Sequence, residues 1–391
     1  MTNIVPNLSS NLSKMWIKII NIEQSLFPQL KESLRIEELS TKEAKLIKIL
    51  DFAEIEKHIT VVTITNTPKD REEIARAFIA KSVYNMQTTR DLIDRLHIDR
   101  TLRILCGWRY AKKIPSETKF SRVFKELSDL KIAEKTQQKF VEEYLSDKIF
   151  HYNATDATKI PLREKPVKVE KIEKTKYKRG RPKKGETREP IKPKILTQQN
   201  EMQTVEEMLT LVSTDCGVGI KQNSKGNREV WIGGKLHISA VDGDIPITAI
   251  YSGANVHDSS VSLPLMQETS QRVNYLFDLQ DAGYDANIIR EFSVKLNHRP
   301  IIDINPKNSK ELKAKIALIE EEKEKFKFFN LPQSSDIHHY NQRSMVERVN
   351  KYLKDDFGCN TIYYQGANKV ASVLAFAILS ICIHQSLKLL T

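Results

Sequence analysis

The chain has 391 residues, with 62 lysines and arginines against 50 aspartates and glutamates, and a net charge of +12 at pH 7. This length allows two or three domains, and the charge favours a polyanionic partner, either nucleic acid or a membrane surface. The four cysteines stand far apart without CxxC or zinc spacing, which indicates free thiols in a reducing compartment rather than a disulfide framework.

Two features bear on secretion and membranes. The N-terminus has no charged region followed by an apolar one, so we expect no signal peptide. The longest apolar run, residues 370–383, is shorter than the roughly 20 residues that a membrane span needs, and it indicates a buried C-terminal helix. We therefore expect a cytoplasmic, nucleoid-associated protein with a nucleic-acid partner and no membrane partner.

The first 146 residues are predicted to be helical. Residues 1–70 hold short apolar periodic stretches and are expected to form a poorly defined helical leader. Residues 71–146 show clear three-to-four spacing and are predicted to form a helical DNA-binding domain, of a size that can include a helix-turn-helix. Ser116 is a predicted helix N-cap, although no Glu or Gln follows at the third position to complete a capping box.

From residue 147 to residue 391, segments rich in β-formers alternate with helical patterns. We expect strands at 148–160, 229–241, 245–253, 274–280 and 298–306, and helices at 257–270, 285–296 and 309–326. A turn at Asp242-Gly243-Asp244 joins the second and third strands. A three-stranded meander followed by strand–helix–strand units predicts a mixed α/β sheet.

A basic segment, residues 162–194, interrupts this predicted sheet. It has 14 basic and five acidic residues, which supply nine of the chain's twelve net positive charges. With so few aliphatic residues it cannot bury a core, so we expect it to be extended or disordered when free. Its centre, Arg179-Gly180-Arg181-Pro182-Lys183, resembles an AT-hook, in which Arg-Gly-Arg lies in the minor groove of A·T-rich DNA. A generic basic linker with phosphate affinity alone is an equally good interpretation.

Three carboxylates occupy unusual places in this pattern. Asp156 lies within the first predicted strand, Asp281 directly follows the fourth, and Glu347 lies on a late helix. An unpaired carboxylate is costly to bury, and a divalent metal relieves that cost. Two Mg²⁺ ions held by such acids can activate an attacking oxygen and stabilise the leaving oxygen of a phosphodiester. Taken singly, each aspartate is more simply interpreted as a cap for local amides.

The late helix, residues 340–354, places this glutamate among cations. With Tyr340 at zero, Arg343 falls at about 300°, Glu347 at about 340° and Lys354 at about 320° around the helix. The four side chains therefore share one stripe, and the opposite, apolar side is expected to pack on the protein. For any single helix of this kind, a solvated charged face is the simplest interpretation.

Together these residues resemble the DDE transposases of bacterial insertion sequences, in the branch with a Tyr-x2-Arg-x3-Glu-x6-Lys signature. The signature is matched at full spacing by Tyr340, Arg343, Glu347 and Lys354. FHYNATDATKI around Asp156 and LQDAGYDA around Asp281 are similar to the two aspartate regions of that family. The segment LIDRLHIDRTLRILCGW resembles a helical DNA-binding domain found ahead of such cores, so the resemblance covers roughly residues 70–390.

The resemblance implies a ribonuclease-H-like mixed-sheet catalytic core, in α/β class, preceded by an all-α N-terminal domain. It implies that Asp156, Asp281 and Glu347 are catalytic and bind Mg²⁺, with Mn²⁺ as an alternative. Arg343 and Lys354 would hold DNA phosphates, and Tyr340 would contact a phosphate or stack on a displaced base. The expected function is a transposase that binds terminal inverted repeats, cleaves the DNA ends and joins the 3′-OH ends to target DNA. Pairing two ends implies a homodimer on double-stranded DNA.

Alternatives remain open at this point. Asp278 and Asp285 flank Asp281 as rival ligands, although Asp278 is mid-strand and Asp285 fits a helix N-cap. The chain as a whole could be a non-catalytic DNA-binding protein, such as a regulator or an inactive transposase derivative, or a stand-alone nuclease. The intact triad and the intact signature spacing favour catalysis over simple binding.

Overall fold

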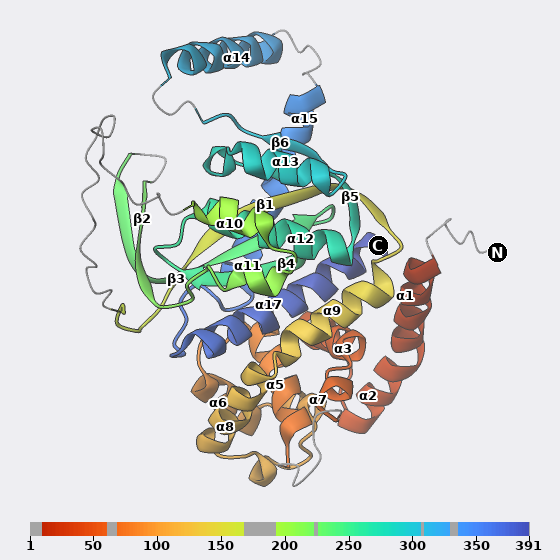
Figure 1. Ribbon diagram of the computed structural model, residues 1–391. Helices are drawn as coiled ribbons and strands as arrows, with labels where there is room; N and C mark the ends of the chain where they lie inside the picture. The colour runs from red at the N-terminus through yellow and green to blue at the C-terminus, as the bar shows by residue number, and fades with distance from the viewer. Residues whose placement is uncertain are drawn as a thin grey trace, which may run out of the picture.

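A computed structural model describes residues 10–60, 69–167, 193–222, 226–305, 309–328 and 335–390. In Figure 1 an all-α region lies below a mixed sheet, and a long C-terminal helix runs between the two. The helices of the all-α region are α1 Ser10–Asn21, α2 Phe27–Leu34, α3 Thr41–Ala53, α4 Glu56–Thr60, α5 Arg71–Val83, α6 Thr89–Ile98, α7 Arg100–Cys106, α8 Glu117–Asp129 and α9 Ile132–Tyr144. The helices predicted after residue 70 are confirmed, and the described part of the leader is helical as well.

Side-chain caps set where several of these helices begin. Before α6, the Thr88 hydroxyl accepts the N–H of Asp91 at 3.1 Å, while the Asp91 carboxylate accepts the N–H of Thr88 at 3.0 Å. This reciprocal capping satisfies two N–H groups that a helix start leaves unpaired. Ser116 occupies the N-cap position of α8 as predicted, but its side chain makes no capping hydrogen bond.

The sheet of the described residues has six strands: β1 Ile149–Pro161, β2 Gly217–Gln222, β3 Arg228–Val241, β4 Ile245–Gly253, β5 Asn274–Gln280 and β6 Arg299–Ile302. β3 pairs antiparallel with β1 along one edge, and with β2 and then β4 along the other. On the far side of β1, strands β5 and β6 follow in parallel register. The mixed sheet predicted for a ribonuclease-H-like core is therefore confirmed.

The connections between strands explain this order. Gly243 and Asp244 have positive φ angles of 83° and 60°, which the tight turn between β3 and β4 requires. The chain then crosses through α12 Ser262–Arg272 to reach the parallel strand β5, and through α13 Asn287–Lys295 to reach β6. Parallel neighbours need such crossovers, so helices cover the sheet beside the strand ends.

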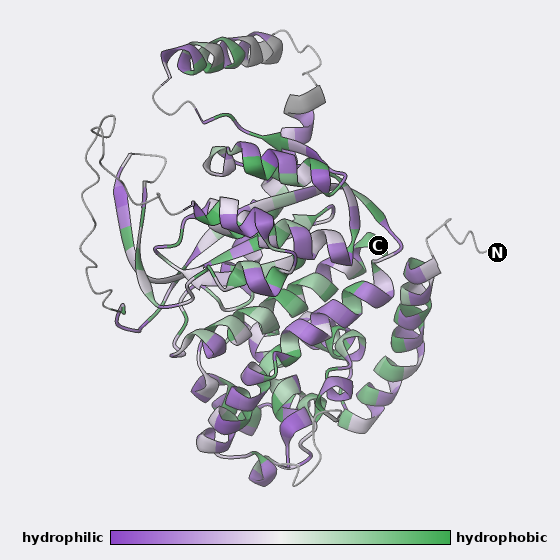
Figure 2. Ribbon diagram, viewed as in Figure 1, coloured by the Kyte–Doolittle hydropathy of each residue, from purple (hydrophilic) through white to green (hydrophobic). Residues whose placement is uncertain are grey.

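The last long helix, α17 Ala367–Leu387, forms the centre of the hydrophobic core. Its Phe376 ring centroid lies 5.7 Å from that of Phe78 on α5 and 6.3 Å from that of Phe124 on α8, and the helix also packs on β4. Figure 2 shows the hydrophobic residues along it. The 24-residue stretch Ala367–Leu390 is long and apolar enough to cross a membrane, but 83% of its apolar window is buried inside the protein. The predicted buried helix is confirmed, although it is longer than the apolar run that predicts it.

The sequence does not predict three of the observed elements, namely β2, α10 Ile195–Glu201 and α11 Val205–Leu209. Thr204 and Glu207 form a capping box at the start of α11, which is a signal that the sequence does contain. The remaining helices are α14 Lys310–Phe328, α15 Ser335–Asn341 and α16 Ser344–Lys351, followed by the π-helical turn Tyr352–Asp356.

Candidate active site

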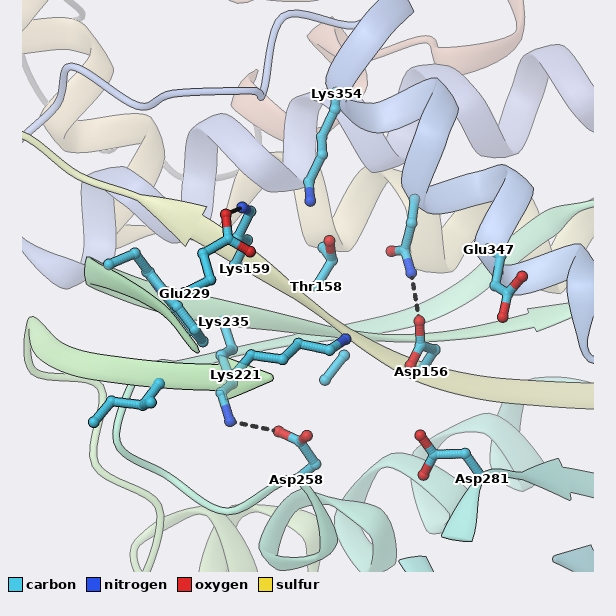
Figure 3. A pocket seen from close by; sticks show the side chains of 14 residues that line it. Asp156, Thr158, Lys159, Lys221, Glu229, Lys235, Asp258, Asp281, Glu347 and Lys354 are labelled. Carbon is cyan, nitrogen blue, oxygen red and sulfur yellow. Dashed lines mark hydrogen bonds and ion pairs between the residues drawn. The ribbon is translucent and has the colours of Figure 1, made fainter. Parts of the chain in front are cut away.

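A cavity of about 500 Å³ lies over the central strand β1 (Figure 3). Its walls come from β1, the β2–β3 hairpin, the 3₁₀ turn Asp258–Val261, the segment after β5, α16 and the π-helical turn. The lining residues are Asp156, Ala157, Thr158, Lys159, Ile220, Lys221, Glu229, Trp231, Lys235, Asp258, Asp281, Glu347, Asn350 and Lys354. The structure therefore brings the three predicted acids and Lys354 to one cavity from four separate elements.

Asp156 lies in the middle of β1, where it pairs across the sheet with Ile238. Burial raises the pKa of its carboxyl group to about 6; the charge of Arg343 opposes that shift and the charge of Asp281 adds to it. Its Oδ2 atom accepts a hydrogen bond from the side-chain amide of Asn350 at 2.9 Å. A cation that enters the cavity would therefore stabilise the ionised form of this carboxyl group.

Asp281 comes directly after β5, which runs parallel to β1 as its neighbour. This adjacency brings Asp281 to the same cavity as Asp156, and in Figure 3 its carboxylate faces that space. Its Oδ1 atom also accepts the N–H of Gly283 at 2.8 Å and so caps the short 3₁₀ turn Ala282–Tyr284. The local capping role and the position in the cavity are thus both present.

Glu347 reaches the cavity from α16, with its side chain 52% exposed. Its Oε1 atom lies 2.5 Å from the guanidinium of Arg343, which is itself centred 5.8 Å from the ring of Tyr340. Tyr340 and Arg343 do not line the cavity, but they adjoin it through this chain of contacts. Three of the signature side chains therefore contact one another in series, and Lys354 shares the cavity with Glu347.

The single helix predicted over residues 340–354 is wrong. Tyr340 belongs to α15, Arg343 is the N-cap of α16, and Lys354 lies in the π-helical turn. The N–H groups of Gln342 and Arg343 bond the carbonyls three residues earlier, which tightens the chain and ends α15. The apolar side is buried as predicted, through Met345, Val346, Val349 and Leu353.

The rival ligands point elsewhere. Asp278 is fully buried on β5, where its carboxylate accepts hydrogen bonds from Asn153 at 3.1 Å and Ser293 at 2.5 Å. Asp285 pairs with Arg290 at 2.9 Å, and Ala286 rather than Asp285 is the N-cap of α13, so that predicted cap is wrong. Neither aspartate lines the cavity, which leaves Asp281 as the acid of this segment that faces it.

Several residues that line the cavity are not among the predicted site residues. Asn350 lies about 280° around the predicted helix from Tyr340, beside the signature stripe, so periodicity alone contained a signal for it. Its Oδ1 atom is buried without a hydrogen-bond partner. Lys221 and Lys235 come from the hairpin strands β2 and β3, and no pattern in the sequence connects them to the acids.

The oxygen atoms of this cavity are of the chemical type that a hard divalent cation binds, because Mg²⁺ prefers carboxylate and amide oxygens. Asp156 is a buried carboxyl that a cation would stabilise, and the unpaired Oδ1 of Asn350 is a further oxygen donor. In the part of the chain that the structure describes, however, no group of three or more His, Cys, Asp and Glu side chains stands close enough to hold a metal ion. Glu347 instead pairs with Arg343.

The helical region, the mixed sheet and the cavity of acids and lysines define a ribonuclease-H-like protein. A family model described as "Transposase DDE domain" matches residues 153–383, and one described as "Transposase domain" matches residues 33–126. The chain belongs to the DDE transposase family, whose substrate is DNA. No curated protein matched the chain.

The family predicted from the sequence is therefore confirmed, while its branch with the Tyr-x2-Arg-x3-Glu-x6-Lys signature stays a prediction. The AT-hook-like residues Arg179, Gly180, Arg181, Pro182 and Lys183 lie outside the described residues.

Proposed function

We propose that the chain is a transposase that binds the terminal inverted repeats of an insertion sequence, cleaves the DNA ends and joins them to target DNA. The observation that carries this proposal is the shared cavity, which Asp156, Asp281 and Glu347 line from β1, the end of β5 and α16. Membership of the DDE family supplies the substrate class.

In this proposal Asp156, Asp281 and Glu347 hold Mg²⁺, with Mn²⁺ as the alternative. The bound metal would activate the attacking oxygen and stabilise the charge on the leaving oxygen. Two observations support this metal site, namely the raised pKa of Asp156 and the unpaired Oδ1 of Asn350. A nearby cation would stabilise both the ionised carboxyl group and the amide oxygen. Glu347 would exchange its pairing with Arg343 for this role.

The chemistry is hydrolysis followed by strand transfer. A water oxygen attacks phosphorus at the DNA end, the bond to the 3′ oxygen breaks, and a free 3′-OH is released. That hydroxyl then attacks a phosphorus of the target DNA, and a second 3′ oxygen leaves. Arg343 and Lys354 would hold the phosphates in line, and Tyr340 would contact a phosphate or stack on a base. Such catalysis consists of positioning and charge stabilisation.

Further DNA contacts belong to the same proposal. Residues 71–146 would form the DNA-binding domain ahead of the catalytic domain 147–391, and Arg179 to Lys183 would enter an A·T-rich minor groove. Two ends must be brought together before joining, so a homodimer would assemble on double-stranded DNA.

The test uses the full chain, Mg²⁺, a labelled DNA carrying the element's ends and a supercoiled target. Cleavage and joining that disappear in Asp156→Ala, Asp281→Ala and Glu347→Gln, with DNA binding retained, would support the proposal. Asp278→Asn is the matched control. Asp278 is buried on β5, the strand that Asp281 follows, but it does not line the cavity. Binding without cleavage by the unmutated chain would instead identify a regulator or an inactive derivative. Cleavage without joining would identify a nuclease.

A further inference from the structure

The hairpin of β2 and β3 presents one of its faces to the cavity. In the antiparallel register Gly219 lies opposite Trp231, and Lys221 lies opposite Glu229. Because side chains alternate along a strand, these four residues share one face of the hairpin. Lys221, Glu229 and Trp231 all line the cavity. The hairpin therefore forms a wall of the candidate active site, although β2 contributes no residue to the family signature.

Two of the four lysines that line this cavity are paired with carboxylates. Lys159 forms an ion pair with Glu229, so Glu229 is engaged even though Lys221 stands opposite it in the register. Lys235 Nζ lies 2.8 Å from Asp258 Oδ1 and 2.9 Å from the carbonyl oxygen of Val256. Among the described residues, no carboxylate lies within ion-pair distance of Lys221 or Lys354.

These two lysines approach the cavity from different walls. Figure 3 shows the Lys221 side chain extending from β2 towards Asp156, while Lys354 points into the same space from the π-helical turn. Burial lowers the pKa of Lys354, the positive charges of Lys159 and Lys221 lower it further, and the negative charges of Asp156 and Glu229 oppose that shift. Two ammonium groups that lack a direct ion-pair partner and repel each other across a cavity are stabilised by an anion placed between them.

We propose that Lys221 is a second phosphate-binding residue, so that the β2–β3 hairpin and the π-helical turn hold one DNA strand between Lys221 and Lys354. The ligand class is a phosphodiester of the strand to be cleaved, held beside the three acids. This inference rests on the proposed function for the identity of that strand. It makes the hairpin a positioning element, because an ammonium group contacts a phosphate as a point charge without reading the base.

Salt dependence of binding tests the inference directly, because each neutralised phosphate of a duplex contributes about 0.9 to the slope of log K against log salt. The full chain is titrated with a labelled duplex of the element's end in EDTA, which prevents metal-dependent cleavage. We expect Lys221→Gln to flatten the slope by about 0.9, and Lys221→Arg to restore it. Lys354→Gln should act similarly, and the double variant should lose about twice as much. An unrelated duplex should show the same loss for Lys221→Gln, because phosphates carry no sequence information.

Lys14→Gln is the matched control, since it removes the same charge from an exposed position on α1, far from β2 in Figure 1. Circular dichroism checks that every variant is folded. An unchanged slope in Lys221→Gln would overturn the inference and identify Lys221 as an internal counterion of Asp156. If the unmutated chain binds but does not cleave in Mg²⁺, the proposed function fails while the slope still decides the role of Lys221. Absence of any binding by the unmutated chain would overturn both.

Discussion

Replacing Asn350 by alanine tests whether the amide that contacts Asp156 matters for catalysis. Asn350 lies one helical turn after Glu347 on α16, and its Nδ2 donates to Asp156 Oδ2 at 2.9 Å. It therefore links the helix that carries one proposed catalytic acid to the strand that carries another. Loss of this contact should let both acids move relative to each other.

The magnitudes separate an effect on stability from an effect on catalysis. A hydrogen bond to a charged group contributes about 1.5–3 kcal/mol, and a buried polar atom without a partner costs about 1–3 kcal/mol. Asn350→Ala removes the hydrogen bond and the unpaired Oδ1, but it leaves the buried Asp156 Oδ2 without this donor, so the net loss of unfolding free energy should be about 1–3 kcal/mol. The alignment of Asp156 loses the side-chain hydrogen bond that ties it to α16, and the same free energy at the transition state corresponds to about 10- to 100-fold in the cleavage rate.

The assay is single-turnover cleavage of a DNA end, measured as a function of Mg²⁺ concentration, with thermal unfolding of the same samples. We expect slower cleavage at saturating DNA and a higher Mg²⁺ requirement, with a modestly lower melting temperature. Asn350→Asp provides a second variant, because a carboxylate in this place would repel Asp156 rather than hold it. Wild-type cleavage and wild-type Mg²⁺ dependence in Asn350→Ala would refute the reasoning.

Three further outcomes are expected. Burial lowers the pKa of His237 to about 4, below its ordinary value of 6.5, so the unfolded chain binds a proton that the folded chain excludes. The contribution of His237 to stability should therefore be constant above pH 6.5 and fall by about 3 kcal/mol between pH 6.5 and pH 4. Burial also lowers the pKa of His384, to about 3, so urea unfolding of His237→Gln should show a pH-dependent loss that is smaller by about 3 kcal/mol than that of the unmutated chain. Phe376→Ala should cost about 3–5 kcal/mol of unfolding free energy, because the ring is 1% exposed between α5 and α8. Arg343→Ala should change that free energy by less than about 1 kcal/mol, because its partner Glu347 is half exposed, yet DNA-end cleavage should drop.

The strands that carry the acids could be predicted because their local pattern agrees with their tertiary environment. β1 and β5 are rich in β-formers, and both form within a few residues of the predicted bounds. β2 could not be predicted, since glycines at 217 and 219 lower strand propensity. A Cβ atom on Gly219 would lie 2.3 Å from the Trp231 ring, so the glycine that weakens the strand signal is what allows the hairpin to pack.

The site was predictable to the level of residue types and less so in its contacts. Family-like spacing pointed to Glu347 and Lys354, and both line the cavity. The break between α15 and α16 was not predictable. The N–H groups of Gln342 and Arg343 bond carbonyl oxygens three residues earlier, and this local change leaves the apolar periodicity of the sequence intact. The pairing of Arg343 with Glu347, by contrast, is the i,i+4 contact that the helical angles of the segment already imply.

The place of α17 in the core has a consequence for the order in which the protein is made. The ribosome synthesises α5 and α8 early, but the ring that covers Phe78 and Phe124 belongs to Phe376, near the end of the chain. An amino-terminal fragment would leave the exit tunnel with these aromatic surfaces exposed to solvent and chaperones. These aromatic surfaces can be covered only after α17 has been synthesised.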